Sequence, residues 1–153
     1  MEPDYYQIRK DANEYFMNLK AIQCPALELE VHFNSRGFNH IIYKKGNIER
    51  PRFEQIPRFQ ILAMAVKIIS KTTTFQEFEE IQKELISWNK GRKTLKTKTI
   101  SYWGLIAIIE NKKIKVILRK IGNGHLHFWS IIPYYSTSPQ RDGKYMRGDP
   151  EYD

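Results

Sequence analysis

Residues 112–133, KKIKVILRKIGNGHLHFWSIIP, decide the fold of this chain. Apolar residues alternate with cationic or polar ones on both sides of Asn123-Gly124, and a period of two sends neighbouring side chains to opposite faces of a strand. Asn-Gly supplies the positive φ angles of a two-residue hairpin loop. The stretch therefore predicts two antiparallel strands, one face of which joins the core. The other face carries Lys115, Arg119 and, as a further candidate, His127.

Two more strands complete the predicted sheet. A turn signal at 110–112 follows the apolar run 100–109, which adds a third consecutive antiparallel strand. Residues 27–33 alternate apolar and polar side chains and predict an earlier strand with His32 on its polar face. The expected fold class is α+β: N-terminal helices with one strand, then a three-strand antiparallel meander that completes a four-stranded antiparallel sheet packed on a central helix.

Four segments have the spacing of helices. The segment 56–69 is apolar around most of its circumference and predicts the central helix, with Pro57 in its first turn. The segment 74–88 starts with a capping-box pattern, Thr74 and Glu77. The predicted helices are residues 5–20, 34–46, 56–69 and 74–88, and the basic segment 89–99 is predicted to be a loop.

Length and composition indicate one domain. For 153 residues we expect a single domain over 1–133, with its core module at about 27–133. Residues 134–153 combine Pro, Gly, Ser and mixed charge, which predicts a disordered tail. The single cysteine, Cys24, favours a reducing compartment. No apolar run reaches about 18 residues, and the N-terminus lacks an apolar signal core, so we expect a cytoplasmic protein that does not span a membrane.

The charge distribution favours a polyanionic partner. The formal net charge is +8, and between residues 90 and 120 only Glu110 opposes the cations. Such a block favours nucleic acid first and anionic membrane second. The alternative is a solvated basic surface with no specific partner. The cations of this block are Lys90, Arg92, Lys93, Lys96, Lys98, Lys112, Lys113, Lys115, Arg119 and Lys120.

The motifs argue against several kinds of catalytic site. Gly122-Asn123-Gly124 precedes a strand and not a helix, so it lacks the context of a nucleotide-binding loop. No CxxC or HExxH is present, and carboxylates are sparse in the basic half, which disfavours two-metal nuclease chemistry. His125 and His127 could share a metal, but no third ligand lies nearby in sequence. We therefore expect no metal and no cofactor.

Three polar residues share one side of the predicted helix at 34–46. At 100° per residue, Arg36, His40 and Tyr43 fall opposite the apolar Phe38 and Ile41. We expect His40 outside the core, either as an ordinary surface residue or in a polar constellation with Arg36 and Tyr43. RNA cleavage by its own 2′-hydroxyl needs a base, an acid and fixed cations. Histidine suits either proton role, and arginine can hold two phosphate oxygens.

The strand at 27–33, the helix SRGFNHI (35–41), the long apolar helix and the terminal meander together resemble the barnase–EndoU–colicin–RelE (BECR) group of nucleases. The resemblance covers about 27–133 and points to the phage-associated, toxin-like branch. It implies helices ahead of a four-stranded antiparallel sheet and a metal-independent endoribonuclease of toxin type. It also implies RNA as the substrate and an acidic antitoxin or immunity protein as a possible partner.

Carried onto this sequence, the resemblance implies His40 as base or acid, Arg119 as phosphate clamp and Ser130 as supporting hydroxyl. His127 is the competing histidine. The hairpin register stays open, because a two-residue turn pairs Lys120 with His127 whereas a three-residue loop pairs Arg119 with His127, and a slip of one residue exchanges the faces. The expected nucleic-acid contacts are Arg36, Tyr43, Arg50, Arg58, Lys115 and Lys120.

Two other functions remain open. Tyr102, Trp103 and Trp129 on a basic sheet could stack unpaired bases in a non-catalytic module that binds single-stranded RNA. The alternative is that these aromatic residues face the core. The third possibility is a basic interaction protein that docks an acidic partner.

Overall fold

A computed structural model describes residues 4–133 and 148–153. Within them the helices are α1 (Tyr5–Met17), α2 (Ser35–Ile42), α3 (Arg52–Gln60) and α4 (Leu62–Lys71). The strands are β1 (Ile22–Cys24), β2 (Leu29–Val31), β3 (Tyr43–Lys44), β4 (Ile48–Glu49), β5 (Glu77–Asn89), β6 (Arg92–Ile109), β7 (Lys112–Ile121) and β8 (His127–Ile132). None of these helices is long and apolar enough to cross a membrane.

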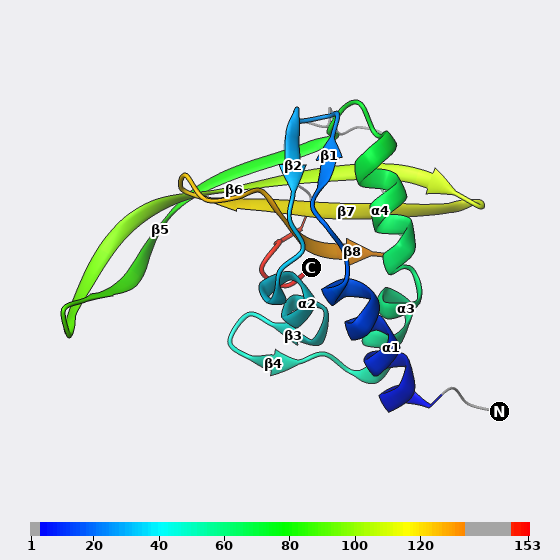
Figure 1. Ribbon diagram of the computed structural model, residues 1–153, viewed down its shortest axis with the longest axis horizontal. Coiled ribbons are helices and arrows are strands. Elements are labelled where there is room, and N and C mark those ends of the chain that lie inside the picture. Colours follow the sequence, from blue (N-terminus) through cyan, green and yellow to red (C-terminus); the bar gives the residue numbers. More distant parts are fainter. Residues whose placement is uncertain (1–3, 134–147) are drawn as a thin grey trace.

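The last four strands form one antiparallel sheet in the order β5-β6-β7-β8 (Figure 1). With the preceding helices, this meander confirms the predicted α+β class. Its fourth strand is β5, and not the predicted strand at 27–33. That segment contains β2, which pairs with β1 in a separate two-stranded sheet. Just after β2, His32 forms a parallel bridge with His127 at the edge of β8.

The helix predicted over 74–88 and the loop predicted over 89–99 are wrong. β5 pairs with β6 from Glu77 opposite Gly104 to Asn89 opposite Arg92. Lys90 and Gly91 form the two-residue turn between them, both with positive φ, as such turns require. The capping-box pattern is a local signal. Pairing with a long neighbouring strand outweighs it, because Phe, Ile and Trp side chains pack well against cross-strand partners.

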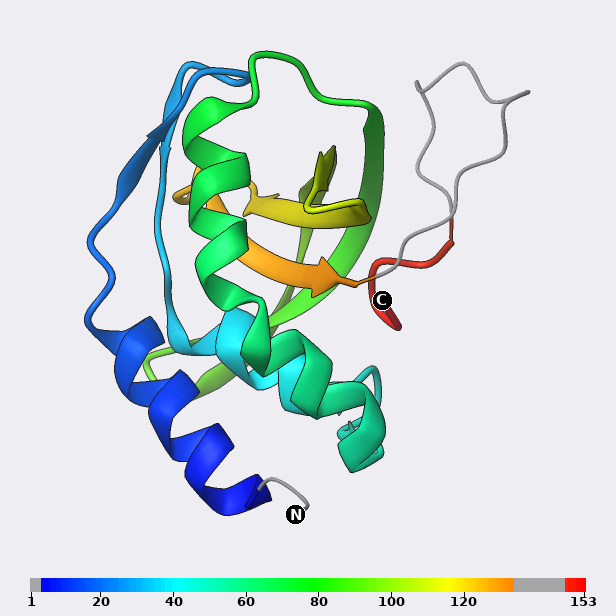
Figure 2. The ribbon, with the colours of Figure 1, turned by 90° about the vertical axis from the view of Figure 1, so that its right-hand side faces the viewer.

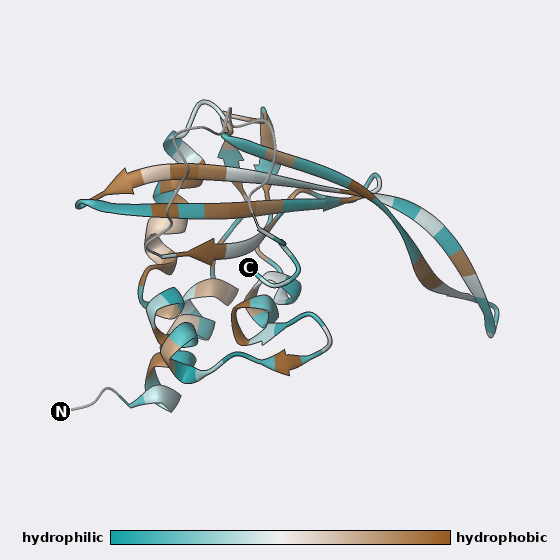
Figure 3. Ribbon diagram, turned by 180° about the vertical axis from the view of Figure 1, so that it is seen from behind, coloured by the Kyte–Doolittle hydropathy of each residue, from teal (hydrophilic) through white to brown (hydrophobic). Residues whose placement is uncertain are grey.

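Half of this hairpin extends past the rest of the sheet. β7 pairs with β6 only over residues 100–109, so residues 82–99 project as a two-stranded arm (Figure 1). Figure 3 shows that the arm is mainly hydrophilic, with isolated hydrophobic bands. Among these apolar residues, Trp88 near its tip is 70% exposed. The arm carries much of the basic block seen in the sequence.

The two remaining turns differ in how well they were predicted. The turn signal at 110–112 is confirmed, since Glu110 and Asn111 connect β6 to β7 with positive φ and Ile109 pairs with Lys112. The turn at Asn123-Gly124 is not a two-residue loop, because residues 122–126 separate β7 from β8.

A bulge sets the register of the last hairpin. Arg119 pairs with His127 and Leu118 with Phe128, but Ile117 pairs with Ser130. Trp129 is therefore the extra residue of β8, and a bulge of this kind bends the strand and re-aims its side chain.

The predicted central helix is divided in two. α3 begins at Arg52, so Pro57 lies inside it and not in its first turn, and α3 ends at Gln60. Ile61 then interrupts the helical path before α4. Figure 2 shows α4 lying along one side of the sheet, with the end of the chain on the other side. The sheet therefore has a helix-covered face and an opposite face.

Each face of the sheet has its own apolar cluster. The main core joins the helices to the helix-covered face, with Phe16, Ile69, Leu118 and Phe128 among its buried members. The opposite face has a smaller cluster of Ile100, Tyr102, Ile117 and Trp129. In β7 the residues of this opposite face alternate with those of the core, so they include Lys115 and Arg119. This opposite face holds the candidate site.

Helix α2 packs directly on the backbone of β8. A Cβ atom on Gly37 would lie 2.2 Å from the carbonyl oxygen of Phe128, so only glycine permits this approach. Asn34 caps the helix by accepting hydrogen bonds from the backbone N–H groups of Arg36 and Gly37. The close contact places His40, one turn further along, beside the bulge of β8.

The C-terminal segment was predicted to belong to a disordered tail. Residues 134–147 of that tail lie outside the described residues. Residues 148–153 lie against the opposite face of the sheet, where the Trp129 indole N–H donates to the Pro150 carbonyl at 2.8 Å and the Ser130 hydroxyl donates to the main-chain oxygen of Asp153 at 2.6 Å.

Candidate nucleic-acid interface

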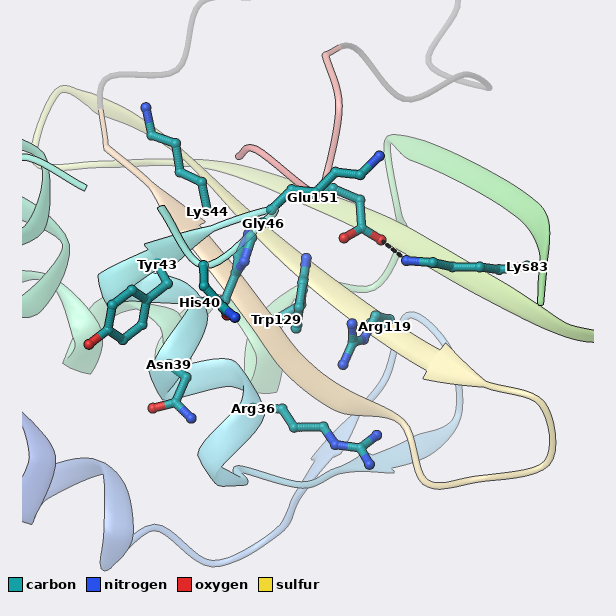
Figure 4. A pocket seen from close by; sticks show the side chains of 12 residues that line it. Arg36, Asn39, His40, Tyr43, Lys44, Gly46, Lys83, Arg119, Trp129 and Glu151 are labelled. Atoms are coloured by element: carbon teal, nitrogen blue, oxygen red, sulfur yellow. Dashed lines mark ion pairs between the residues drawn. The ribbon is translucent and has the colours of Figure 1, made fainter. Parts of the chain in front are cut away.

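Trp129 is the centre of a three-layer stack. The His40 ring lies 4.0 Å from the Trp129 ring at an interplanar angle of 16°. The Arg119 guanidinium carbon lies 3.5 Å from the same ring centroid, and Figure 4 shows Trp129 between the two. Contacts on both faces and the indole hydrogen bond to Pro150 hold the ring in one orientation. The stack thus joins α2, β7 and β8 into one rigid unit.

Arg119 also holds the second histidine predicted for the site. Its Nε donates to His127 Nε2 at 2.9 Å, and His127 Nδ1 lies 3.2 Å from the His125 carbonyl. Because an arginine nitrogen can only donate, His127 accepts at Nε2 and carries its proton on Nδ1. Burial, then the charge of Arg119, lower the pKa of His127 to about 4. His127 is therefore neutral near pH 7.

His40 is buried, so the first predicted alternative, an ordinary surface residue, is wrong. It belongs to neither apolar cluster and lines a pocket together with Arg36 and Tyr43, as in the second alternative. Its exposed fraction is 5%. It does fall opposite Phe38 and Ile41, as the spacing predicted, but Trp129 and Arg50 cover that side of α2. Arg50 Nη2 lies 3.3 Å from His40 Nε2, and Arg50 Nε donates to the His40 carbonyl at 3.0 Å. Burial first, and then nearby arginines, lower the pKa of His40 to about 3.

A basic pocket of about 490 Å³ opens beside the stack (Figure 4). Arg119, His40 and Trp129 form one part of its lining, and Tyr43 forms another. Its remaining cations come from α2, from β3 and the turn after it, and from β5. These cations are Arg36, Lys44, Lys45 and Lys83, and the one carboxylate of the lining is Glu151. An anionic ligand is therefore favoured there.

A second, larger depression of about 990 Å³ begins where the first ends. Arg36 lines both. The second depression runs along β5 and β6 to the turn before β8, and its lining includes Lys98, Lys120, His125 and His127. The His125 and His32 rings are 4.2 Å apart, so all four histidines of the chain lie near the start of β8 or beside its bulge.

Three predicted phosphate contacts are too buried to form a binding surface. Lys115 is fully buried and paired with the Glu77 carboxylate. Arg50 and Arg58 are nearly covered, and burial lowers the pKa of both guanidinium groups. The side chains of Arg50 and Arg58 lie beneath the site. Arg58 donates to the Ser130 hydroxyl at 2.9 Å.

The remaining predicted residues fall into two groups. Arg36 and Tyr43 line the basic pocket, and Lys120 lines the second depression. Ser130 is fully buried, with its hydroxyl engaged by Arg58 and by the main chain of Asp153. Its hydroxyl is thus a structural link between α3, β8 and the C-terminal segment.

Sequence reasoning missed two groups of the pocket lining, Lys83 and Glu151. Lys83 lies on β5, and Glu151 lies in the segment expected to be disordered. Tyr102, on β6, was predicted only as a candidate for base stacking. The Glu151 carboxylate accepts a hydrogen bond from the Tyr102 hydroxyl at 2.8 Å and pairs with Lys83 at 3.5 Å. The sequence could have identified Lys83. If residues 77–89 are assigned to a strand, the period of two places Lys83 on the same face of the sheet as Tyr102.

The two histidines predict acid-sensitive stability. Both pKa values are below that of an unfolded histidine, so the unfolded chain binds more protons between about pH 4 and 6.5, and stability falls as the pH drops through that range. By pH 5 the loss should be roughly 2 kcal/mol per histidine. Urea unfolding at pH 7 and pH 5 measures it. In the His127→Gln variant, the loss of unfolding free energy between pH 7 and pH 5 should be about half that of wild type. An unchanged loss would contradict the assignment of this pH dependence to the two histidines.

Comparisons with protein-family models, with curated proteins and with solved structures found no match. The fold and the site thus define an α+β protein with a basic, histidine-bearing pocket. Among the described residues, no group of three or more His, Cys, Asp or Glu side chains is arranged to hold a metal ion.

Proposed function

We propose that this protein is a metal-independent ribonuclease of toxin type that cleaves RNA by attack of the 2′-hydroxyl. The observation that carries the proposal is the stack of Arg119, Trp129 and His40 at the wall of a cationic pocket, with His127 hydrogen-bonded to Arg119 in the adjoining depression. The order of elements, with helices first and a four-strand meander last, supports the resemblance to the BECR nucleases.

Arg119 and Arg36 are the proposed phosphate-binding groups. Arg119 lines the pocket with its guanidinium held flat on Trp129, which fixes the donor plane before a ligand binds. Arg36 is exposed where the two depressions meet. Planar, preorganised donors of this kind hold two phosphate oxygens and stabilise the charge that develops during transfer.

His127 is the proposed proton acceptor. It is neutral, and its lone pair is on the nitrogen that faces Arg119. A phosphate that binds Arg119 takes over this donor and leaves Nε2 available for the 2′-hydroxyl proton. His125, exposed in the adjoining depression, is the histidine that a leaving 5′-oxygen can reach. His40 is buried, stacks on Trp129 in the pocket wall and acts as a positioning residue.

The arm extends the cationic surface away from the pocket. Lys83 is paired with Lys98, Leu85 with Lys96 and Asn89 with Arg92, and cross-strand partners share a face. One face of the arm therefore carries a row of cations that begins at the pocket with Lys83. At about 3.3 Å per residue, this row is long enough to follow several phosphates of a single strand.

The proposal predicts cleavage of RNA in the presence of EDTA. The products should carry 2′,3′-cyclic phosphate ends, and an oligonucleotide with deoxyribose at the cleavage site should stay intact, since it lacks the nucleophile. His127→Ala should lower the rate by about 10²–10⁴-fold. Full activity in the His40→Ala, His127→Ala double variant would exclude the mechanism. Thermal unfolding and the Trp129-dependent fluorescence check that each variant is folded.

RNA binding without cleavage is a second candidate function. The observation that favours it is that both ring nitrogens of His127 are engaged, and that His40 contacts Arg50. A protein of this kind would leave RNA intact, and its affinity would fall steeply with salt. The cleavage assay above therefore separates the two functions.

A further inference from the structure

We infer that Lys83 and Tyr102 form a second phosphate-binding site next to Arg119, and that the chain's own Glu151 occupies it. The inference rests on the proposed function, because it names a subsite of the same RNA-binding surface. Glu151 is an internal stand-in for one phosphate of the bound strand, and RNA must displace it.

The groups around the Glu151 carboxylate are a donor set for an anion. The Tyr102 hydroxyl donates to Oε1 at 2.8 Å, and Lys83 Nζ lies 3.5 Å from the same oxygen. Burial lowers the pKa of the nearby Arg119 guanidinium, and Tyr102 first and then the negative charge of Glu151 counter that effect. One cation and one hydroxyl thus meet at the same carboxylate oxygen. A phosphate can use the same donors with more acceptor oxygens.

The Tyr102 hydroxyl marks this point as a built site. The side chain of Tyr102 is fully buried, and a buried hydroxyl requires an acceptor. Burial raises its pKa, and the hydrogen bond to Glu151 raises it further, so the hydroxyl stays a proton donor at neutral pH. If Glu151 leaves, another anion is the favoured replacement beside Lys83 and Arg119.

The location of the site joins the two parts of the proposed RNA path. Lys83 lies where the cationic row of the arm reaches the basic pocket, and Glu151 lies in the lining of that pocket (Figure 4). A strand of RNA that follows the arm to Arg119 passes this point. The carboxylate therefore blocks the path while it stays bound.

Residues 148–153 also contact the rest of the protein through main-chain oxygen atoms. The Glu151 carbonyl accepts from the Lys45 backbone N–H at 3.1 Å, and Pro150 accepts from Trp129. Asp149 and Asp153 flank Glu151 in the sequence DPEYD, so the whole segment is acidic on a basic face. This charge pattern matches that of a short nucleic-acid backbone.

The test compares Glu151→Gln with Glu14→Gln, which removes the same charge from the exposed surface of α1. Binding of a fluorescent deoxyribose-blocked RNA is measured by anisotropy at constant salt. Glu151→Gln should bind about 5-fold or more tightly than wild type, the lower range of coupling between competing ligands. Glu14→Gln should bind within about 2-fold of wild type. Unchanged or weaker binding by Glu151→Gln would overturn the inference. If binding is unchanged and cleavage is lost, Glu151 acts as a proton acceptor instead.

Inorganic phosphate separates this inference from the proposed function. Calorimetry should show tighter phosphate binding by Glu151→Gln than by wild type, and adding Tyr102→Phe should reduce it again. This result supports the site even if the protein proves unable to cleave RNA. If RNA is cleaved but phosphate binds equally to wild type and to Glu151→Gln, the ribonuclease proposal stands and the second site is wrong.

Discussion

Replacing Arg119 by alanine is expected to lower the rate of RNA cleavage by about 10²–10³-fold, the usual cost of removing one preorganised charge-stabilising donor. The substitution removes the donor at the pocket wall, one layer of the Trp129 stack and the hydrogen bond to His127. Arg119→Lys keeps the charge but loses the planar fork, so its rate should lie between those of wild type and alanine. Single-turnover cleavage of a short RNA in EDTA gives the rates.

Arg52→Ala is the matched control for this experiment. The Arg52 guanidinium also lies on aromatic rings, 4.3 Å from the ring centroid of Tyr5, but it does not line either depression. It should leave the cleavage rate within about 2-fold of wild type, as expected of a surface substitution away from the site. Equal losses in the Arg52 and Arg119 variants would mean that general charge, and not the pocket, drives cleavage.

The sheet was predictable where its signals are local. Alternation in β7 and β8 and the turn signal before Lys112 lie within short windows, and the structure has these strands. The N-terminal half of β6 carries few apolar residues, so its pairing with β5 cannot be recognised from a short window. The spacing of Phe78, Ile81 and Trp88 is compatible with a helix and also with a paired strand, so the sequence of 77–89 alone favours a helix. Only the partner strand decides between the two.

The candidate site was predictable in its residues but not in their burial. Arg119 and His127 are hydrogen-bonded, and Trp129 lies between Arg119 and His40, because α2 packs on the edge strand that carries His127. Period-two alternation assigned Lys115 and Arg119 to one face, which is their actual arrangement. It could not show that this face has its own apolar cluster around Trp129. It also could not show that residues 148–153 lie on this face, because that contact joins distant parts of the chain.

The buried pair of Lys115 and Glu77 predicts the largest effect on stability. The two side chains are fully or almost fully buried and form an ion pair. Gly104 makes room for them, since a Cβ atom there would lie 3.0 Å from the Glu77 carboxylate and 3.2 Å from Lys115 Cε. Lys115→Met should lower the free energy of unfolding by about 3–5 kcal/mol, because it leaves a buried carboxylate without its cation. Urea unfolding at pH 7 measures the loss.

Restoring neutrality should recover most of this loss. In the Lys115→Met, Glu77→Leu double variant no charge of the pair is left in the interior, and replacing a buried pair by apolar side chains is often neutral or stabilising. Lys67→Met, at an exposed position of α4, should change stability by no more than about 0.5 kcal/mol. If the double variant is as unstable as Lys115→Met alone, the loss comes from the shape of the lysine side chain and not from its charge. Lys115 would then be a packing residue, and the space left by Gly104 would serve its alkyl chain.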